Sequence, residues 1–431
     1  MHTFDLNLEH ITKVEGSAAL ELRVKDNKVE SVHFKITEHK RFFTEAIKGK
    51  PLAALPQLLA RICGTCSNAH LMASIEACED ALGITPSKQT MLLRHLTMHG
   101  LIIRDHALHL YLFSMPDIFG KDAFLDFDEE DPVQHQLLHD AFEMKAAGNH
   151  LAMLVAGRSV HALHPTIGGF LHFPEKEGIA ESIKKLEAIR PAVLRLVEVF
   201  KNSPFHFDRN TNFMALTTDA FRYLDGWIET SAGEKIPEEK YRDHVERVVL
   251  PYSQASAYKH NHSSYMVGSL ARVNLAKDRL HQNTKETLKD VLTLFPSTDI
   301  YHNNLAQAIE ILHSIDDSLE ILKTTTFTPE PVIKAAPKAG IGIGVIEAPR
   351  GTLYHKVHID DKGIVIEGEI IVPTGQNQVN IEEDIWRLTD ELLAKDTPKE
   401  TIAFEIEKLI RAYDPCMSCA SHFLKIDWQK V

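Results

Sequence analysis

Long stretches of this chain place hydrophobic residues at the spacing of an α-helix. In the clearest stretch, about 302–323, the apolar positions are Leu305, Ile309, Leu312, Ile315 and Leu319. Residues spaced by three and four fall on one face of a helix, which can then pack against other helices. The same pattern predicts helices at about 51–82, 87–114, 130–156, 177–201, 381–394 and 399–412. Helices of this kind are typical of a bundle core.

Two other segments alternate hydrophobic and polar residues, as strands do. Residues 20–36 flank an Asp26-Asn27 turn and predict a β-hairpin near the N-terminus. Residues 340–373 predict several short strands, which follow a proline-containing connector at about 324–340. We therefore expect the α+β class: a mainly helical bundle core with small sheet elements near the N-terminus and at about 340–373. The broken pattern between 205 and 286 is interpreted as an irregular excursion within a single domain, 1–431.

Charge and composition exclude several classes of partner. The chain has 431 residues, of which 44% are hydrophobic and 25% charged, and a formal net charge of -13. Nucleic acids and anionic membranes require a concentrated basic face, so we expect neither as a partner. The apolar windows are far shorter than the roughly 18 residues of a membrane helix, and no signal peptide is visible. Few cysteines, at ligand rather than disulfide spacing, favour a cytoplasmic protein.

Two Cys-x-x-Cys pairs lie at opposite ends of the chain, Cys63 with Cys66 and Cys416 with Cys419. The two-residue spacer lets both sulfurs of a pair bind one ion, and His70 follows Cys66 by four residues, on the same helical face. We therefore expect the four thiolates to meet at one metal site. The spacing alone leaves structural zinc, an iron–sulfur cluster and a catalytic nickel or iron site open.

The residues around each pair carry a resemblance that narrows these alternatives. The first metal-binding signature of the nickel-iron hydrogenase large subunit is similar to Arg61-Ile62-Cys63-Gly64-Thr65-Cys66-Ser67-Asn68-Ala69-His70. The second is similar to Asp414-Pro415-Cys416-Met417-Ser418-Cys419-Ala420-Ser421-His422. Supporting segments occur in the family's order: Lys13-Val14-Glu15-Gly16, Arg104-Asp105-His106-Ala107-Leu108-His109, Ala348-Pro349-Arg350-Gly351 and Val372-Pro373-Thr374. The resemblance runs end to end and is greatest for the cytoplasmic bidirectional and sulfur-reducing hydrogenases.

This resemblance implies a catalytic subunit that cleaves dihydrogen reversibly and heterolytically. By position, Cys63 and Cys416 match the terminal nickel ligands, while Cys66 and Cys419 match the thiolates that bridge nickel to iron. The iron in this family also carries cyanide and carbon monoxide. Bridging sulfurs hold two ions at a fixed separation, so that one metal position can stay open for dihydrogen. The thiolate of Cys416 is the expected base for the proton.

Further residues match the family's proton relay and the groups around the open metal position. Glu15 matches the relay glutamate, although on its own it would be interpreted as an exposed acid beside a glycine. Arg350 matches the arginine suspended over the open position, and Asp105 and Asp414 match the carboxylates that hold it. Without the resemblance, the arginine would be a solvated loop residue and the two acids a helix-surface charge and a turn former.

Three more residues are expected to contact the cofactor. Pro349 directly precedes the arginine, and Thr374 matches the hydroxyl residue that donates to a cyanide ligand. His70 can donate a hydrogen bond to a bridging sulfur, but a core histidine with partners of its own fits the same position nearly as well.

The resemblance also implies a magnesium ion and a processing step. The family's usual magnesium-binding glutamate is replaced here by Thr44, so Glu45, one residue later, is the expected ligand and Glu38 a second possibility. His422 and the backbone carbonyl of Ile370 match the other protein contacts. Most relatives are cut after this histidine, so we expect a maturation endopeptidase to remove residues 423–431.

Electrons must leave through other subunits, because the only cysteine outside the two pairs is Cys78. We expect an iron–sulfur small subunit and further subunits that bind a nicotinamide or deazaflavin carrier, since no Gly-x-Gly-x-x-Gly follows a strand here. Two other classes of protein are alternatives to a hydrogenase subunit. The quinone-reducing subunit of respiratory complex I shares the fold but lacks the metal cysteines, and a structural-zinc scaffold would hold zinc alone.

Overall fold

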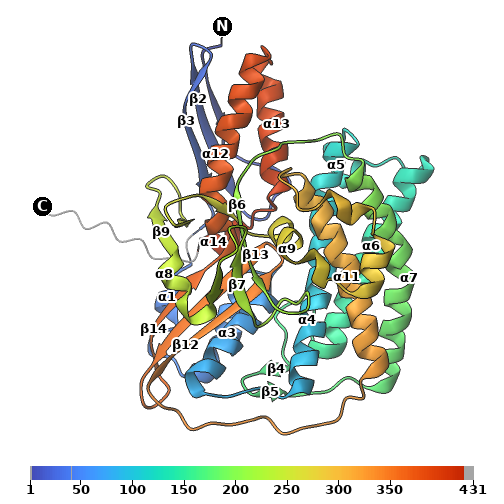
Figure 1. The fold of residues 1–431 in the computed structure, drawn as a ribbon, viewed down its shortest axis with the longest axis vertical. Helices are drawn as coiled ribbons and strands as arrows, with labels where there is room; N and C mark the ends of the chain where they lie inside the picture. Colours follow the sequence, from blue (N-terminus) through green and yellow to red (C-terminus); the bar gives the residue numbers. More distant parts are fainter. Residues whose placement is uncertain (1, 40, 422–431) are drawn as a thin grey trace, which may run out of the picture.

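The computed structural model describes residues 2–39 and 41–421. Helices make up 49% and strands 20%, which confirms the α+β prediction. A block of long helices forms one side of the molecule, and small sheets with their covering helices form the other (Figure 1). The two sides meet around α14 (Met417–Ala420), which lies near the middle of the molecule. In the part described, no helix is long and apolar enough to cross a membrane.

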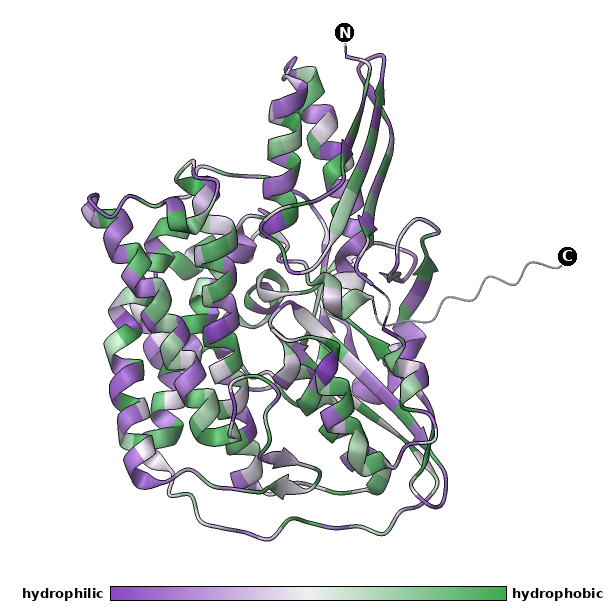
Figure 2. Cartoon of the chain, turned by 180° about the vertical axis from the view of Figure 1, so that it is seen from behind, coloured by the Kyte–Doolittle hydropathy of each residue, from purple (hydrophilic) through white to green (hydrophobic). Residues whose placement is uncertain are grey.

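Four long helices pack side by side in the helical block. They are α4 (Lys88–Ala107), α6 (Pro132–Ala156), α7 (Lys176–Lys201) and α11 (His302–Thr324). Hydrophobic and hydrophilic residues alternate around them, as the helical spacing predicts (Figure 2). Two glycines let α4 and α6 approach closely, because a Cβ on Gly100 would lie 2.9 Å from the backbone nitrogen of Ala152 and one on Gly148 only 2.8 Å from that of Arg104. A π-helical turn, Leu108–Ser114, and α5 (Met115–Ile118) extend α4.

The N-terminal sheet contains the predicted hairpin and one strand more. β1 (Phe4–Leu8), β2 (Ala18–Lys25) and β3 (Lys28–Ile36) are antiparallel neighbours. The turn between β2 and β3 uses Asp26 and Asn27 with φ of 49° and 65°, the left-handed conformation that these residues tolerate. The helices α12 (Pro373–Ala394) and α13 (Lys399–Ala412) lie beside this sheet (Figure 1).

The C-terminal strands form a meander of β12 (Gly340–Ala348), β13 (Gly351–Ile359) and β14 (Val365–Ile371). The helix α3 (Ser67–Leu82), which follows the first cysteine pair, packs on it. Contact is so close that a Cβ on Gly342 would lie 1.9 Å from the carbonyl oxygen of Ala77. Glycine is therefore required at this position of the strand. Helix α12 begins at Pro373, earlier than the predicted 381, because proline is well tolerated in a first helical turn.

The segment 205–286 is more regular than the sequence suggested. It contains a four-stranded sheet in the order β11-β6-β7-β8 and a separate β9–β10 hairpin. The strands are β6 (Asn212–Thr217), β7 (Trp227–Thr230), β8 (Lys235–Pro237), β9 (Val245–Val249), β10 (Ser256–His260) and β11 (Tyr265–Met266). Strands of two to six residues are too short to show clear alternation, which is why the pattern looked irregular.

The remaining elements are short connectors between these layers. They are α1 (Phe43–Ala46), α2 (Leu55–Leu59), β4 (Pro165–Thr166), β5 (Gly169–Phe170), α8 (Tyr241–His244), α9 (Ser269–Ala276) and α10 (Gln282–Thr287). Residues 325–339 contain no regular helix or strand, in agreement with the predicted connector.

Candidate metal centre

The four paired cysteines meet in the interior, as the sequence predicted. Cys63 and Cys66 lie just before α3, and Cys416 and Cys419 lie at α14. Their sulfurs all lie within 4.8 Å of one another, and each of the four residues is at most 4% exposed. The Sγ atoms are 3.5 Å apart between Cys63 and Cys416 and 2.9 Å apart between Cys66 and Cys419. Cys78 lies on α3 outside this cluster, where burial raises the pKa of its thiol.

The two ends of the chain are held together by backbone contacts next to the cluster. Glu15 forms a β-bridge with Cys416, and its carbonyl oxygen accepts a hydrogen bond from Met417 at 3.0 Å. Gly16 has φ of 81°, and a Cβ there would lie 2.8 Å from the Cβ of Met417. Glycine is therefore needed so that the N-terminal loop can lie directly against the second cysteine pair.

The pKa shifts of the cysteine thiols indicate that the cluster suits a cation. Hydrogen bonds from Cys416, Cys419 and Cys66 hold the pKa of the Cys63 thiol well below its usual value. Burial raises the pKa of Cys416 and Cys419 well above theirs. Without a cation, the cluster therefore loses one proton readily and resists losing more. Soft thiolates that need a positive ion to ionise together fit nickel and iron, and also zinc.

The Glu15 carboxylate contacts this cluster directly. Its Oε2 atom accepts hydrogen bonds from the Cys416 thiol at 3.1 Å and from the backbone N–H of Ser418 at 3.0 Å. Burial, and then the negative charge of Cys63, raise the pKa of Glu15 above the usual carboxyl value. The residue is thus a carboxyl group that can hold a proton beside a metal-binding sulfur.

Arg350 is held between the two predicted carboxylates. Its Nη1 donates to Asp105 Oδ2 at 2.5 Å, and its Nε donates to Asp414 Oδ1 at 3.2 Å. Burial opposes the charge, but Asp105, Asp414 and the thiols of Cys416 and Cys66 keep the pKa of Arg350 above its usual value. Its Nη2 is 3.1 Å from Asp414 but makes no hydrogen bond to the described residues. This buried N–H group is available to a ligand in the site.

A buried ion network that the sequence analysis missed supports the loop before Arg350. Arg272 on α9 donates to the carbonyl oxygens of Ala348 at 3.0 Å and Pro349 at 2.9 Å. Its guanidinium also contacts both carboxylate oxygens of Glu310, at 2.5 and 2.7 Å, and Glu347 at 2.6 Å. A signal was present, because Glu310 is the one charged residue in the otherwise apolar run from Ala308 to Leu312.

A second missed residue is Arg104, one position before Asp105. It is 6% exposed and donates a hydrogen bond to the carbonyl oxygen of Thr65, within the first cysteine loop. The hydroxyl of Thr65 lies 3.1 Å from the sulfur of Cys63. Arg104 therefore fixes the loop that presents the first cysteine pair.

Thr374 and His70 also lie near the centre. The Oγ1 atom of Thr374 accepts a hydrogen bond from the backbone N–H of Cys416 at 2.8 Å, which leaves its own hydrogen to donate. The Nδ1 atom of His70 lies 3.1 Å from Nε2 of His355 on β13. One ring nitrogen of His70 is thus shared with another core histidine, and its contact with a bridging sulfur stays a prediction.

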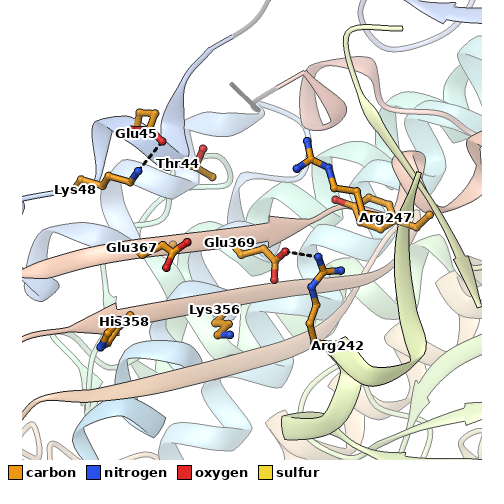
Figure 3. Close-up of a pocket in the computed structure, with 11 residues that line it drawn as sticks. Thr44, Glu45, Lys48, Arg242, Arg247, Lys356, His358, Glu367 and Glu369 are labelled. Atoms are coloured by element: carbon orange, nitrogen blue, oxygen red, sulfur yellow. Dashed lines mark hydrogen bonds and ion pairs between the residues drawn. The ribbon is translucent and has the colours of Figure 1, made fainter. Parts of the chain in front are cut away.

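The two predicted magnesium-binding carboxylates lie at different places. The Oε2 atom of Glu38 accepts a hydrogen bond from the Ser17 N–H at 3.1 Å, next to the Gly16 loop. Glu45 lines a surface pocket of ≈ 370 Å³, where its carboxylate pairs with Lys48 at 2.7 Å (Figure 3). Glu369, which precedes Ile370, lines the same pocket and pairs with Arg242 at 3.2 Å. His422 lies outside the described residues, so the magnesium site stays a prediction.

Comparison with known proteins agrees with this geometry. The family described as "Nickel-dependent hydrogenase" matches residues 41–148 and 227–422. The alpha subunits of sulfhydrogenases 1 and 2 of Pyrococcus furiosus are each 31% identical to this chain, over 427 and 425 residues. The matches cover 98% of this chain in both cases, and 98% and 100% of the relatives. The predicted likeness to the sulfur-reducing group is confirmed.

A solved structure is similar over nearly the whole fold. It is that of an NAD+-reducing [NiFe]-hydrogenase, with a TM-score of 0.85, 23% sequence identity, and coverage of 98% of this chain and 100% of that one. The sequence relatives are subunits of larger hydrogenases, which implies partner subunits for this chain as well. With four buried cysteines converging where the family holds its metals, this chain belongs to the nickel-dependent hydrogenases, as a catalytic large subunit whose nickel–iron site acts on dihydrogen.

Proposed function

We propose that dihydrogen is cleaved heterolytically at this site, with the sulfur of Cys416 accepting the proton and Glu15 carrying it away. When bound, nickel and an iron with cyanide and carbon monoxide ligands supply the electrophilic centre and receive the electrons. The observation that carries the proposal is the 3.1 Å contact between Cys416 Sγ and Glu15 Oε2. A proton can pass directly between two groups at this distance.

Glu15 is suited to the relay by its surroundings. The N–H of Ser418 fixes the same carboxylate oxygen that faces the sulfur, so the acceptor is already oriented. Burial raises the pKa of Glu15, which brings it closer to that of a thiol and favours transfer in both directions. Both features support a reversible relay.

Arg350 is proposed to polarise or orient dihydrogen at the open metal position. Asp105 and Asp414 fix two edges of its guanidinium, and the unsatisfied Nη2 hydrogens are left for the site. A guanidinium is always protonated, so it supplies fixed positive charge without competing for the released proton.

Replacement of Glu15 by glutamine tests the relay. Glutamine keeps the size and the acceptor oxygen but cannot take up a proton, so we expect dihydrogen-dependent dye reduction to fall by at least about 100-fold. Nickel content and the infrared bands of the centre should stay unchanged. Glu9→Gln, at an exposed N-terminal carboxylate, is the matched control. A Glu15→Gln enzyme with wild-type turnover would rule out the relay.

The remaining cofactor contacts belong to the same proposal. Thr374 would donate its hydroxyl hydrogen to a cyanide ligand, since its oxygen already accepts from Cys416. Pro349 would shape the pocket beside Arg350. Magnesium would be bound by Glu45 or Glu38, the carbonyl of Ile370 and His422; loss of one magnesium per subunit in His422→Ala would support this set, and unchanged magnesium would oppose it.

We also propose specific partners and a maturation step. Electrons would pass to an iron–sulfur small subunit and then to a nicotinamide or deazaflavin carrier on further subunits, in the cytoplasm. The similar solved enzyme is NAD+-reducing, which favours nicotinamide. An endopeptidase would cut between His422 and Phe423 after nickel insertion. Active protein whose intact mass still includes Val431 would contradict that cut.

A further inference from the structure

A second set of metal-binding side chains lies outside the cysteine centre. Glu234 lies in the turn between β7 and β8, His244 ends α8, and His260 ends β10. One carboxylate oxygen and one nitrogen from each ring all lie within 4.8 Å of one another. Figure 1 shows α8 and β9 at the edge of the molecule opposite the helical block. We propose that these three residues bind a divalent transition metal of the zinc class, as a site separate from the nickel–iron centre.

The fold holds His244 and His260 side by side. Val245, the residue after His244, is the register partner of His260 in the β9–β10 hairpin. The rings stack with centroids 5.9 Å apart. His260 is also fixed by a tight turn, because it exchanges two backbone hydrogen bonds with Ser263, at 3.0 and 2.9 Å. The backbone therefore holds the two imidazoles next to each other.

Glu234 reaches the same point from a neighbouring turn. Its backbone N–H donates to the Thr230 hydroxyl at 3.2 Å, and its carbonyl accepts from the Thr230 N–H at 3.1 Å. Gly233, with φ of 86°, allows this turn. The Glu234 Oε2 atom lies 2.9 Å from Nε2 of His260. The ordered turn thus places the Glu234 side chain beside His260.

The hydrogen bonding of His260 matches that of a metal ligand. Its Nδ1 lies 3.1 Å from the carbonyl oxygen of His244, which can only accept, so Nδ1 carries the hydrogen. A backbone carbonyl that fixes one nitrogen in this way directs the lone pair of the other outward. That nitrogen faces the carboxylate of Glu234, and two acceptors in contact require a shared proton or a cation.

His244 distinguishes a metal site from a simple ion pair. A proton shared between Glu234 and His260 would satisfy those two groups alone. Neither ring nitrogen of His244 has a hydrogen bond or ion pair among the described residues, yet one lies within 4.8 Å of both other donors. The side-chain amide of Asn261 also lies 3.1 Å from His260 Nε2 and competes with Glu234 for this nitrogen. A cation would engage all three donors together.

The donor set defines the metal class. Two neutral imidazoles and one carboxylate suit zinc, cobalt, nickel or copper, whereas magnesium and calcium prefer oxygen ligands. Tetrahedral zinc with bonds of about 2.0–2.1 Å holds its donors roughly 3.4 Å apart. Because the three donors lie within 4.8 Å of one another, small side-chain movements are enough to reach this geometry. The four sulfurs of the cysteine cluster, where the family holds its metals, likewise lie within 4.8 Å of one another. The Glu234 side chain is 41% exposed, which lets water complete the coordination.

Zinc binding by the intact hydrogenase complex, purified without a polyhistidine tag and washed with chelator, tests the site. Equilibrium dialysis against radioactive zinc should give about one zinc per catalytic subunit. Glu234→Gln and His244→Ala should each weaken zinc binding by at least about 10-fold. His262→Ala, on the same turn with a side chain 90% exposed, should bind zinc normally. Dye reduction should be unchanged in all three variants, which shows that they are folded.

Zinc-edge X-ray absorption identifies the ligands independently. Nitrogen and oxygen neighbours at about 2.0–2.1 Å with imidazole scattering would support the site. Sulfur neighbours would place the zinc at the cysteine cluster and overturn the proposal. Absence of bound zinc, or equal zinc binding in Glu234→Gln, His244→Ala and wild type, would overturn it as well. A failed relay at Glu15 would leave these results unaffected.

Discussion

At the scale of single residues, the site works by balancing buried charge. Arg350 and Arg104 place two positive charges close to the four thiols. The carboxyl groups of Asp105, Asp414 and Glu15 lie beside these charges and thiols. Buried charges are stable only when paired and fully hydrogen bonded. The Nη2 group of Arg350 lies 3.1 Å from Asp414 but makes no hydrogen bond to the described residues.

Replacement of Arg350 by lysine tests whether the geometry of the guanidinium matters beyond its charge. Lysine keeps the positive charge but cannot donate to Asp105 and Asp414 through separate edges. We expect dihydrogen-dependent dye reduction to fall by at least about 100-fold, with nickel content retained. Arg387→Lys, in an exposed ion pair with Glu391, is the control. Activity within about twofold of wild type would mean that charge alone suffices.

At the scale of elements, α12 joins the cysteine centre to the N-terminal sheet. Thr374 at its start contacts Cys416, and Glu382 further along accepts hydrogen bonds from the Phe34 backbone at 2.9 Å and the Tyr252 hydroxyl at 2.8 Å. Burial raises the pKa of Glu382 to about 7 from the usual 4.5. The sheet and the helix are therefore linked through a carboxyl group that stays protonated to a higher pH than usual.

This link predicts how stability changes with pH. Because the folded pKa lies above the unfolded one, the stabilisation is complete below about pH 4.5 and is lost as pH rises through about 7. Glu382→Gln mimics the protonated form at every pH. The variant should gain about 1–3 kcal/mol over wild type between about pH 5 and pH 8.5, seen as a rising difference in Tm. Glu391→Gln, on an exposed part of α12, should show no such trend; a constant difference for Glu382→Gln would refute the assignment.

The elements also show how far sequence patterns reach. Helical spacing predicted α6, α7, α11 and α13 to within a few residues, because apolar residues recur at helical spacing along each whole segment. The strands between 205 and 286 escaped detection, because two to six residues carry too little periodicity. The sequence analysis did not predict the Arg272–Glu310 ion pair. A buried charge is recognised by its partner, and these two partners are far apart in the sequence. Arg350 and Glu15 were predicted as site residues from the family resemblance alone. The residues next to them in the sequence would by themselves predict solvent-exposed side chains.

At the scale of the whole molecule, the metal centre joins residues from both ends of the chain. Cys66 and Cys419 are separated by 353 residues but their sulfurs are 2.9 Å apart. The Lys13–Gly16 loop, the loop before α3 and the segment before α14 must all be in place before the four sulfurs can meet. The site can therefore be completed only after both ends of the subunit have been synthesised and docked.

The central claim is that these four sulfurs hold nickel and iron, and one comparison tests it directly. Nickel content and the infrared spectrum should be measured on the purified complex of wild type, Cys419→Ala and Cys78→Ala. Wild type and Cys78→Ala should contain about one nickel per subunit and show the bands of carbon monoxide and cyanide on iron, while Cys419→Ala should lose both. Zinc alone in wild type, or nickel and infrared bands that survive in Cys419→Ala, would contradict the account.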